Sequence, residues 1–275
     1  MHEAMSWGTY APGWVARAVV ALSRYTPLGR GAARRQLWRL FTSMHTGPVD
    51  CLLWGGKARL HPARNYTERK ALMRPDRMDR DEYAVLRSRM SQPGAVFVDV
   101  GANAGLYSFY SAMHAGPNSH VLAIEPNAPL LDRLRFNLAL AREAQRIDPS
   151  VNVAMAGVAV GDADGEAFLS IEESEGLSTL LTGAGQPVAV RRLAALLDDH
   201  RIVPISVIKI DVEGYEDRVL TPYLSAVPES RWPQTIIIEH VHAILWRVDC
   251  IAFCVERGYR VDGKTNNNTI LTLSR

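Results

Sequence analysis

The spacing of hydrophobic residues changes along the chain, and each spacing predicts a different kind of element. Residues 14–44 carry apolar side chains three and four positions apart, which predicts amphipathic helix on either side of a break at Pro27-Leu28-Gly29. Apolar runs at 49–54 and 57–61 flank Gly55-Gly56 and predict a β-hairpin. Residues 65–72 and 79–90 return to helical spacing, whereas residues 1–12 follow neither pattern and look unstructured.

From residue 91 onward, short apolar runs alternate with segments of helical spacing. The runs predict strands at 96–100, 119–124, 151–160, 205–210 and 235–238, with helices at 103–114, 126–145, 191–197, 214–224 and 241–256. Further extended segments lie at 166–171 and 187–190, and a hairpin of 259–262 with 269–273 closes the chain. This alternation predicts an α/β fold with a parallel sheet covered on both faces. We therefore expect a helical and β-hairpin extension at 1–90 and a main domain at 91–275.

The two parts differ in charge, although the chain of 275 residues has a net charge of only +2. Residues 1–90 hold 16 Lys and Arg against 7 Asp and Glu, and the remainder holds 15 against 22. A basic part can bind an anionic membrane, a phosphate group or nucleic acid, or it can be a solvated arginine-rich face. The apolar stripe of 14–44 can equally lie on a membrane, pack on the main domain or contact a second subunit.

Composition places the chain among globular proteins, with 47% hydrophobic and 22% charged residues. Cys51, Cys250 and Cys254 form neither a disulfide framework nor a zinc-binding pattern, so we expect reduced core residues and a cytoplasmic protein. We find no signal peptide and no apolar run long enough to span a membrane. Peripheral contact with the inner face of the membrane is expected only through residues 14–44.

Acidic residues follow the predicted strands of the main domain at their carboxyl ends, where doubly wound sheets bind ligands. They are Asp99, Glu125, Asp162, Asp211 and Glu239. An acid at the second strand can accept hydrogen bonds from both hydroxyls of a ribose. In the turn that follows the first strand, Asn103 and Leu106 stand where a dinucleotide fingerprint needs glycine, so NAD is disfavoured.

A smaller adenosine-containing ligand with an amino-acid tail fits this turn better. The backbone of 101–105 and Asp99 would hold the tail, Glu125 the ribose, and Asp162 the adenine amino group. Structural alternatives remain open, because Asn103 can simply cap its helix and Asp162 can simply form a turn. Asn127 is likewise placed to cap the helix that follows Glu125.

Six blocks of the main domain resemble the FkbM family of S-adenosylmethionine-dependent methyltransferases. They are Phe97–Tyr107, Ile124–Asn127, Ala159–Asp162, Gly176–Leu180, Ile208–Glu216 and Ile236–Glu239. The resemblance covers about residues 90–275 and implies a Rossmann-like class I fold, with a seven-stranded sheet whose last strand is antiparallel. It also implies O-methylation of a sugar, glycolipid or polyketide-type hydroxyl. The cofactor-binding residues would be Asp99, Gly101, Ala102, Asn103, Gly105, Glu125, Asn127 and Asp162.

The candidates for catalysis follow the fourth and fifth strands of the main domain. Lys209 lies within a strand that should be covered on both faces, so it needs a partner among Asp211, Glu213 and Glu239. An aliphatic hydroxyl needs a base, and Asp211, Glu239 and His240 are candidates with Glu213 in reserve. We assign no metal, although Asp211, Glu239 and His240 could also hold a divalent cation. Residues 172–186 are the candidate lid over the site.

Three other functions remain compatible with the sequence. They are an NAD-dependent oxidoreductase, an RNA methyltransferase that uses the basic extension, and a methyltransferase-like partner without activity. We expect a small-molecule, glycan or lipid-linked acceptor rather than nucleic acid, because the chain has no motif for nucleobase methylation.

Overall fold

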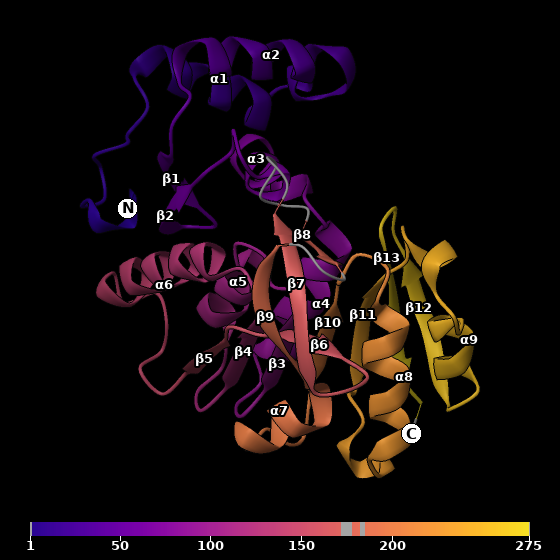
Figure 1. Cartoon of the computed structure of the whole chain (residues 1–275). Helices are drawn as coiled ribbons and strands as arrows, with labels where there is room; N and C mark the ends of the chain where they lie inside the picture. Colours follow the sequence, from indigo (N-terminus) through magenta and orange to yellow (C-terminus); the bar gives the residue numbers. More distant parts are fainter. Residues whose placement is uncertain (1, 172–177, 182–184, 275) are drawn as a thin grey trace.

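A seven-stranded sheet forms the centre of the computed structural model, which describes residues 2–171, 178–181 and 185–274 (Figure 1). Its strand order is β12-β13-β11-β10-β3-β4-β5. The strands are β3 (Val96–Val100), β4 (His120–Ile124), β5 (Asn152–Ala156), β10 (Val207–Ile210), β11 (Thr235–Glu239), β12 (Tyr259–Lys264) and β13 (Asn268–Leu273). Neighbouring strands from β5 to β11 are parallel, and β13 runs antiparallel to both β11 and β12. The predicted α/β fold with an antiparallel last strand is confirmed.

Helices cover both faces of this sheet, as the unbroken apolar runs predict. Phe97 packs in one cluster with α4 (Arg80–Met90), α5 (Leu106–His114) and α6 (Ala128–Glu143). Val98, its neighbour in β3, packs in a second cluster with α7 (Leu193–Asp199), α8 (Glu216–Ala226) and α9 (Cys250–Val255). Successive strand residues point to opposite faces, so all five residues of β3 are buried. Cys250 and Cys254 lie reduced in the second cluster, as expected.

The N-terminal 90 residues form a helical layer above a hairpin (Figure 1). The layer consists of α1 (Trp14–Tyr25), the 3-10 turn η2 (Pro27–Gly29) and α2 (Gly31–Met44). The hairpin of β1 (Val49–Leu53) and β2 (Gly56–Leu60) follows, then α3 (Tyr66–Met73), the turn η3 (Pro75–Arg77) and α4. These elements lie close to their predicted positions. Ala16, Phe41 and Leu60 share one apolar cluster with Phe109 of α5, so a single core joins the N-terminal part to the main domain.

Residues 2–10 are ordered by a buried arginine, which corrects the expectation that they are unstructured. Arg59 is 1% exposed and pairs with Asp50 at 2.7 Å. Its guanidinium also donates to the carbonyl oxygens of His2, Met5 and Ser6. Local spacing could not predict this order, because its cause lies about fifty residues away along the chain.

A second, four-stranded sheet lies beside the first and was not predicted. Its order is β6-β9-β7-β8, with β6 (Ala159–Gly161), β7 (Gly165–Ile171), β8 (Ser178–Leu181) and β9 (Gln186–Arg192). The single strand predicted at 151–160 is therefore two strands in two sheets. Residues 178–181 of the predicted lid form β8, whereas 172–177 and 182–184 lie outside the described residues.

The helix predicted over 241–256 is interrupted, because side chains from α8 hold the connecting backbone. Glu216 accepts from the indole of Trp246 and Asp217 from the amide of Arg247. A 3-10 turn spans η5 (Ala243–Leu245), and α9 begins only after Asp249, whose carboxylate accepts from two amides of its first turn. Among the described residues, no helix has both the length and the apolar character that crossing a membrane requires.

Candidate active site

A cavity of about 480 Å³ opens at the carboxyl ends of β3, β4, β10 and β11. The predicted site residues that line it are Gly101, Ala102, Asn103, Glu125, Lys209, Asp211, Glu213 and Glu239. Asp99, Gly105, Asn127, Asp162 and His240 are not among its lining residues. The edge of the sheet therefore gathers side chains far apart in sequence, as the rule for doubly wound sheets predicts.

Two glycines let the turn after β3 pass close to its neighbours. Gly101 has φ 75°, and a Cβ there would lie 1.8 Å from the carbonyl oxygen of Asp211. Gly105 has φ 72°, and its Cβ would lie 2.6 Å from Leu134 of α6. A side chain at Gly101 would meet backbone, whereas one at Gly105 would displace the Leu134 side chain and strain the positive φ. The glycines of this turn are thus needed for packing within the protein.

The first amides of the turn donate to the protein itself. Those of Gly101 and Ala102 both donate to the carbonyl oxygen of Ile124 at 3.0 Å, and that of Ala104 donates to the Asn103 side chain. These three N–H groups are engaged and do not face the cavity as free donors. That the amides of the turn hold the ligand's tail therefore stays a prediction, although Gly101, Ala102 and Asn103 line the cavity.

Glu125 is held by two backbone amides at the wall of the cavity. Its carboxylate accepts from Asn103 and Asn127, each at 2.9 Å. Burial, together with the negative charges of Asp99 and Asp211, raises the pKa of Glu125 to about 7 against the effect of the two amides. Because a carboxylate has about four acceptor positions, two remain for hydroxyl groups of a ligand. Asn127 does not cap α6 with its side chain; its backbone amide binds Glu125 instead.

Asp99 lies one layer beneath the cavity. It is 1% exposed and accepts from the hydroxyl of Ser108 at 2.7 Å, and burial raises its pKa. On the neighbouring strand, Lys209 stands directly opposite in the register. Asp99 therefore supports the site through α5 and β10 and does not line the cavity.

Lys209 is a buried cation with three neighbours. Its ammonium binds Asp211 at 2.7 Å and lies 4.8 Å from the ring centre of Tyr107. Burial alone would lower the pKa of Lys209, but the charges of Asp211 and Asp99 outweigh it and raise the pKa. The ion pair expected from the sequence is present, and it fixes the Asp211 carboxylate at the mouth of the cavity.

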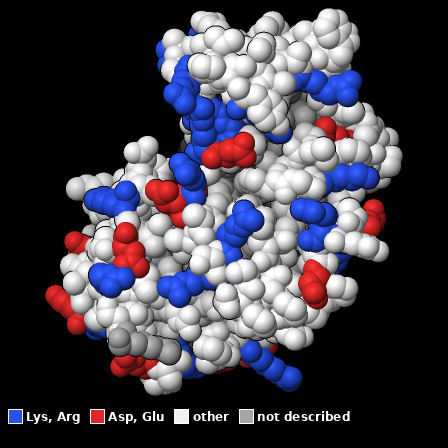
Figure 2. Space-filling view, turned by 180° about the vertical axis from the view of Figure 1, so that it is seen from behind, with Lys and Arg blue, Asp and Glu red and all other residues white. Residues whose placement is uncertain are grey.

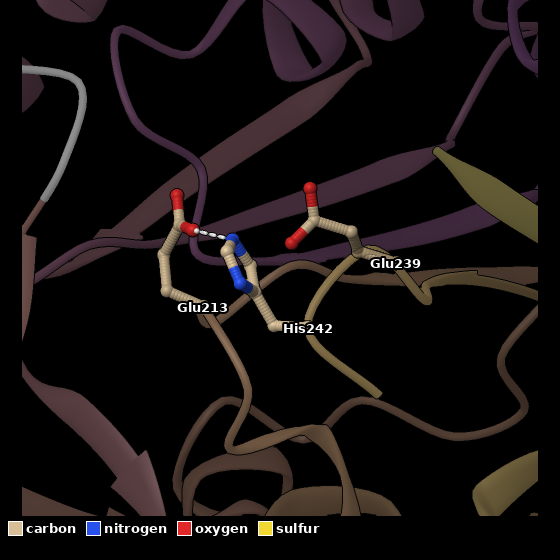
Figure 3. A group of neighbouring side chains, drawn as sticks. All are labelled: Glu213, Glu239 and His242. Carbon is tan, nitrogen blue, oxygen red and sulfur yellow. Dashed lines mark ion pairs between the residues drawn. The ribbon is translucent and has the colours of Figure 1, made fainter. Parts of the chain in front are cut away.

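Glu213, Glu239 and His242 point toward one another (Figure 3). Glu213 has φ 55° and pairs with His242 at 3.1 Å. Burial raises the pKa of Glu239 to about 9, with further repulsion from Asp211 and Glu213. The raised pKa favours the protonated form of Glu239, which can donate a hydrogen bond. Burial and Asp211 raise the pKa of Glu213 as well.

His242 was missed by sequence reasoning, which selected His240. The ring of His240 lies 3.1 Å from the Thr269 hydroxyl on β13, outside the cavity. The chain leaves β11 at Glu239 and turns, so that the second histidine reaches the cavity. The sequence His-Val-His at 240–242 contains both histidines, and the turn after β11 determines which of them reaches the cavity.

The same three side chains form a donor set that a divalent cation can use. One ligand atom from each of Glu213, Glu239 and His242 lies within 4.8 Å of the others. Two carboxylates and an imidazole suit several divalent ions. Within the ranges that the structure describes, this is the set of three that could hold a metal.

The structure does not bring Asp162 to the cavity. This residue is exposed at the end of β6. Apolar residues of the same stretch, of α6 and of β7 line the cavity instead, namely Val158, Ala159, Val160, Leu130 and Leu169. A flat aromatic ring would therefore meet an apolar slot here, without the acid predicted from the sequence.

Known proteins resemble this chain in sequence and in fold. The family model described as the methyltransferase FkbM domain matches residues 99–261. The AMB antimetabolite synthetase AmbE of Pseudomonas aeruginosa is 36% identical over 104 residues, which are 36% of this chain but only 4% of that protein. The 31-O-demethyl-FK506 methyltransferase FkbM of Streptomyces tacrolimicus is 27% identical over 181 residues, 56% of this chain and 67% of that protein. A solved O-methyltransferase of Bacillus cereus in complex with SAH aligns with a TM-score of 0.43 and 14% identity, over 71% of this chain and 81% of that one.

Proposed function

The chain belongs to the FkbM family of methyltransferases, and from this membership we propose that it transfers the methyl group of S-adenosylmethionine to a hydroxyl group. The acceptor would be a sugar, a lipid-linked glycan or a secondary metabolite. The observation that carries the proposal is the Glu125 carboxylate, which two amides hold at the end of β4 facing a cavity of about 480 Å³.

The cavity offers a suitable place for each half of the cofactor. Glu125 keeps acceptor positions for the two ribose hydroxyls. The apolar slot formed by Leu130, Val158 and Val160 fits an adenine ring. The amino-acid tail would lie toward Tyr66 and Thr67, which line the cavity beyond Asn103.

S-adenosylmethionine supplies an electrophilic methyl group, so the protein must align the acceptor oxygen and remove its proton. We assign proton removal to His242, with Glu213 stabilising the imidazolium that forms. Glu239, whose raised pKa favours the protonated form, donates a hydrogen bond that orients the acceptor. Asp211, held by Lys209, accepts a hydrogen bond from the hydroxyl group that is to be methylated, and it is the second candidate for the base.

The cofactor assignment is tested by calorimetry with S-adenosylhomocysteine. Glu125→Ala is expected to weaken binding at least about tenfold, because a charged acceptor is lost. Glu143→Ala, an exposed glutamate on α6, is the matched control and should bind as the unaltered protein does. Equal affinity in both variants, or binding of NAD in preference, would reject the assignment.

The catalytic assignment is tested by transfer of labelled methyl into fractionated glycans, lipids and RNA from the source cells. His242→Gln is expected to lower the rate of methyl transfer about 100-fold and to leave cofactor affinity unchanged. The control variant His240→Gln is expected to keep the rate of the unaltered protein. Equal rates in the two variants would contradict the role of His242. Activity lost with a chelator and restored by a divalent cation would reassign Glu213, Glu239 and His242 to a metal site. Label in RNA would favour the nucleic-acid alternative.

A further inference from the structure

A second cavity of about 460 Å³ adjoins the candidate active site. Tyr66, Lys70, Asp79 and Asn267 line both cavities. We call this second cavity the basic cleft, because it is lined by five basic residues from α2, α3, η3, α4 and the link between α3 and η3. They are Arg34, Lys70, Arg74, Arg77 and Arg80. Figure 2 shows Lys and Arg gathered where the α1–α2 layer meets the domain below it.

Most positive charges of the basic cleft lack a counter-charge. Within the described part of the chain, Arg34, Arg77 and Arg80 form no ion pair or side-chain hydrogen bond. Arg74 donates to the carbonyl oxygen of Gly29 at 3.1 Å. Burial lowers the pKa of Arg74, and repulsion from Arg34 and Arg77 lowers it further. An anion would remove this repulsion.

Two of the three acidic residues that line the cleft are held by hydrogen bonds within the protein. Asp79 accepts from Lys70 at 3.3 Å and from the Tyr107 hydroxyl at 3.0 Å. Glu82 accepts from Thr265 and from Asn268 on the β12–β13 hairpin. Of the three acids that line the cleft, only Asp81 has no bonding partner within the described residues. The cleft as a whole is thus positive.

The two cavities have opposite charge and are joined by a continuous row of contacts. Lys209 lies over Tyr107, the Tyr107 hydroxyl binds Asp79, and Asp79 pairs with Lys70 at the edge of the cleft. The acceptor end of the active site holds the carboxylates of Asp211 and Glu213, which would repel an anion. A molecule that spans both cavities would therefore place a hydroxyl beside the acids and an anionic group among the arginines.

We propose that the basic cleft binds a phosphate or pyrophosphate group carried by the methyl acceptor. The inference rests on the proposed function, since it places the acceptor hydroxyl in the active site. Guanidinium groups match phosphate oxygens in pairs, and four arginines with one lysine exceed what a carboxylate needs. The phosphate can come from a soluble sugar phosphate or from a lipid-linked glycan. Exposed Trp14 and Tyr25 on α1 would favour the second source.

Calorimetry with inorganic pyrophosphate, in the presence of saturating S-adenosylhomocysteine, tests the cleft on the full chain. Arg34→Ser combined with Arg77→Ser should weaken pyrophosphate binding at least about tenfold and leave S-adenosylhomocysteine binding unchanged. The control pair Arg135→Ser and Arg260→Ser removes the same charge from exposed ion pairs elsewhere. Thermal unfolding of each variant verifies that it folds. Because neither Arg34 nor Arg77 makes an ion pair, we expect the variant that lacks both arginines to fold normally.

Vesicle binding separates the two sources of the phosphate. Binding to phosphatidylcholine vesicles that contain polyprenyl phosphate, but not to plain ones, identifies a lipid-linked acceptor. Pyrophosphate binding without vesicle binding identifies a soluble one. The proposal is overturned if the unaltered protein binds no pyrophosphate, if the control pair loses as much affinity, or if oligouridylate displaces pyrophosphate more effectively than a sugar phosphate does. Failure to bind S-adenosylhomocysteine would instead reject the proposed function.

Discussion

Glu125→Gln separates the charge of the buried carboxylate from its shape. The folded protein raises the pKa of Glu125 from 4.5 to about 7, so the folded state binds this proton more tightly than the unfolded chain. Stability from this group is therefore fully present below pH 4.5 and is lost as the pH rises through 7. Between about pH 5 and about pH 8, the loss amounts to about 2.5 kcal/mol of unfolding free energy.

Glutamine at position 125 does not titrate, and its side chain can accept hydrogen bonds through one oxygen only. At about pH 5 we expect the variant to be less stable by about 1–2 kcal/mol, because the Asn103 or Asn127 amide loses its acceptor. At about pH 8 the difference should vanish or reverse, since the unaltered protein then bears the cost of ionising Glu125.

Urea unfolding of both proteins without cofactor, at the two pH values, measures this change. Glu143→Gln on the exposed face of α6 controls for a general effect of lost charge. Other titrating groups, including Glu239, are present in both proteins and largely cancel in the comparison. A stability difference that stays constant with pH to within about 0.5 kcal/mol would refute the assigned cause.

Two further substitutions test the packing that supports the site. Gly101→Ala should destabilise by more than about 2 kcal/mol in urea unfolding, because its Cβ meets the Asp211 carbonyl. Gly94→Ala, at φ 69° in open space, should cost only about 1 kcal/mol, and equal losses would contradict the clash. Arg59→Met should cost about 3–5 kcal/mol and expose residues 2–10 to limited proteolysis. An N-terminus that stays as protected as in an Arg135→Met control would argue against that role.

Elements with strong local patterns could be predicted from the sequence. The break at 27–29 lies between two amphipathic stripes, and the hairpin at 49–61 has a glycine turn, so each carries its own signal. The central strands are apolar runs long enough to be recognised alone. The family resemblance implied seven strands with an antiparallel last one, and the gathering of Glu125, Lys209 and Asp211 at one edge follows from the parallel topology.

Features that depend on distant contacts could not be predicted. The break before α9 results from Glu216 and Asp217 holding Trp246 and Arg247, so helical spacing there was misleading. His242 reaches the cavity only because the chain turns after β11. Asp162 follows a strand, as the other acids do, but that strand belongs to the second sheet. Spacing along the chain carries no information about which sheet a strand joins.

The apolar cluster that runs from α1 through the hairpin to α5 limits how this protein can change over evolution. A recombination event that exchanged residues 1–90 with those of a relative would replace about half of a shared core, including Phe41 and Leu60, which lie in one cluster with Phe109. New acceptor preferences should therefore arise by substitutions at surface positions such as the cleft arginines, one residue at a time. Comparison of relatives would then show a well-preserved interior beneath a rapidly diverging rim.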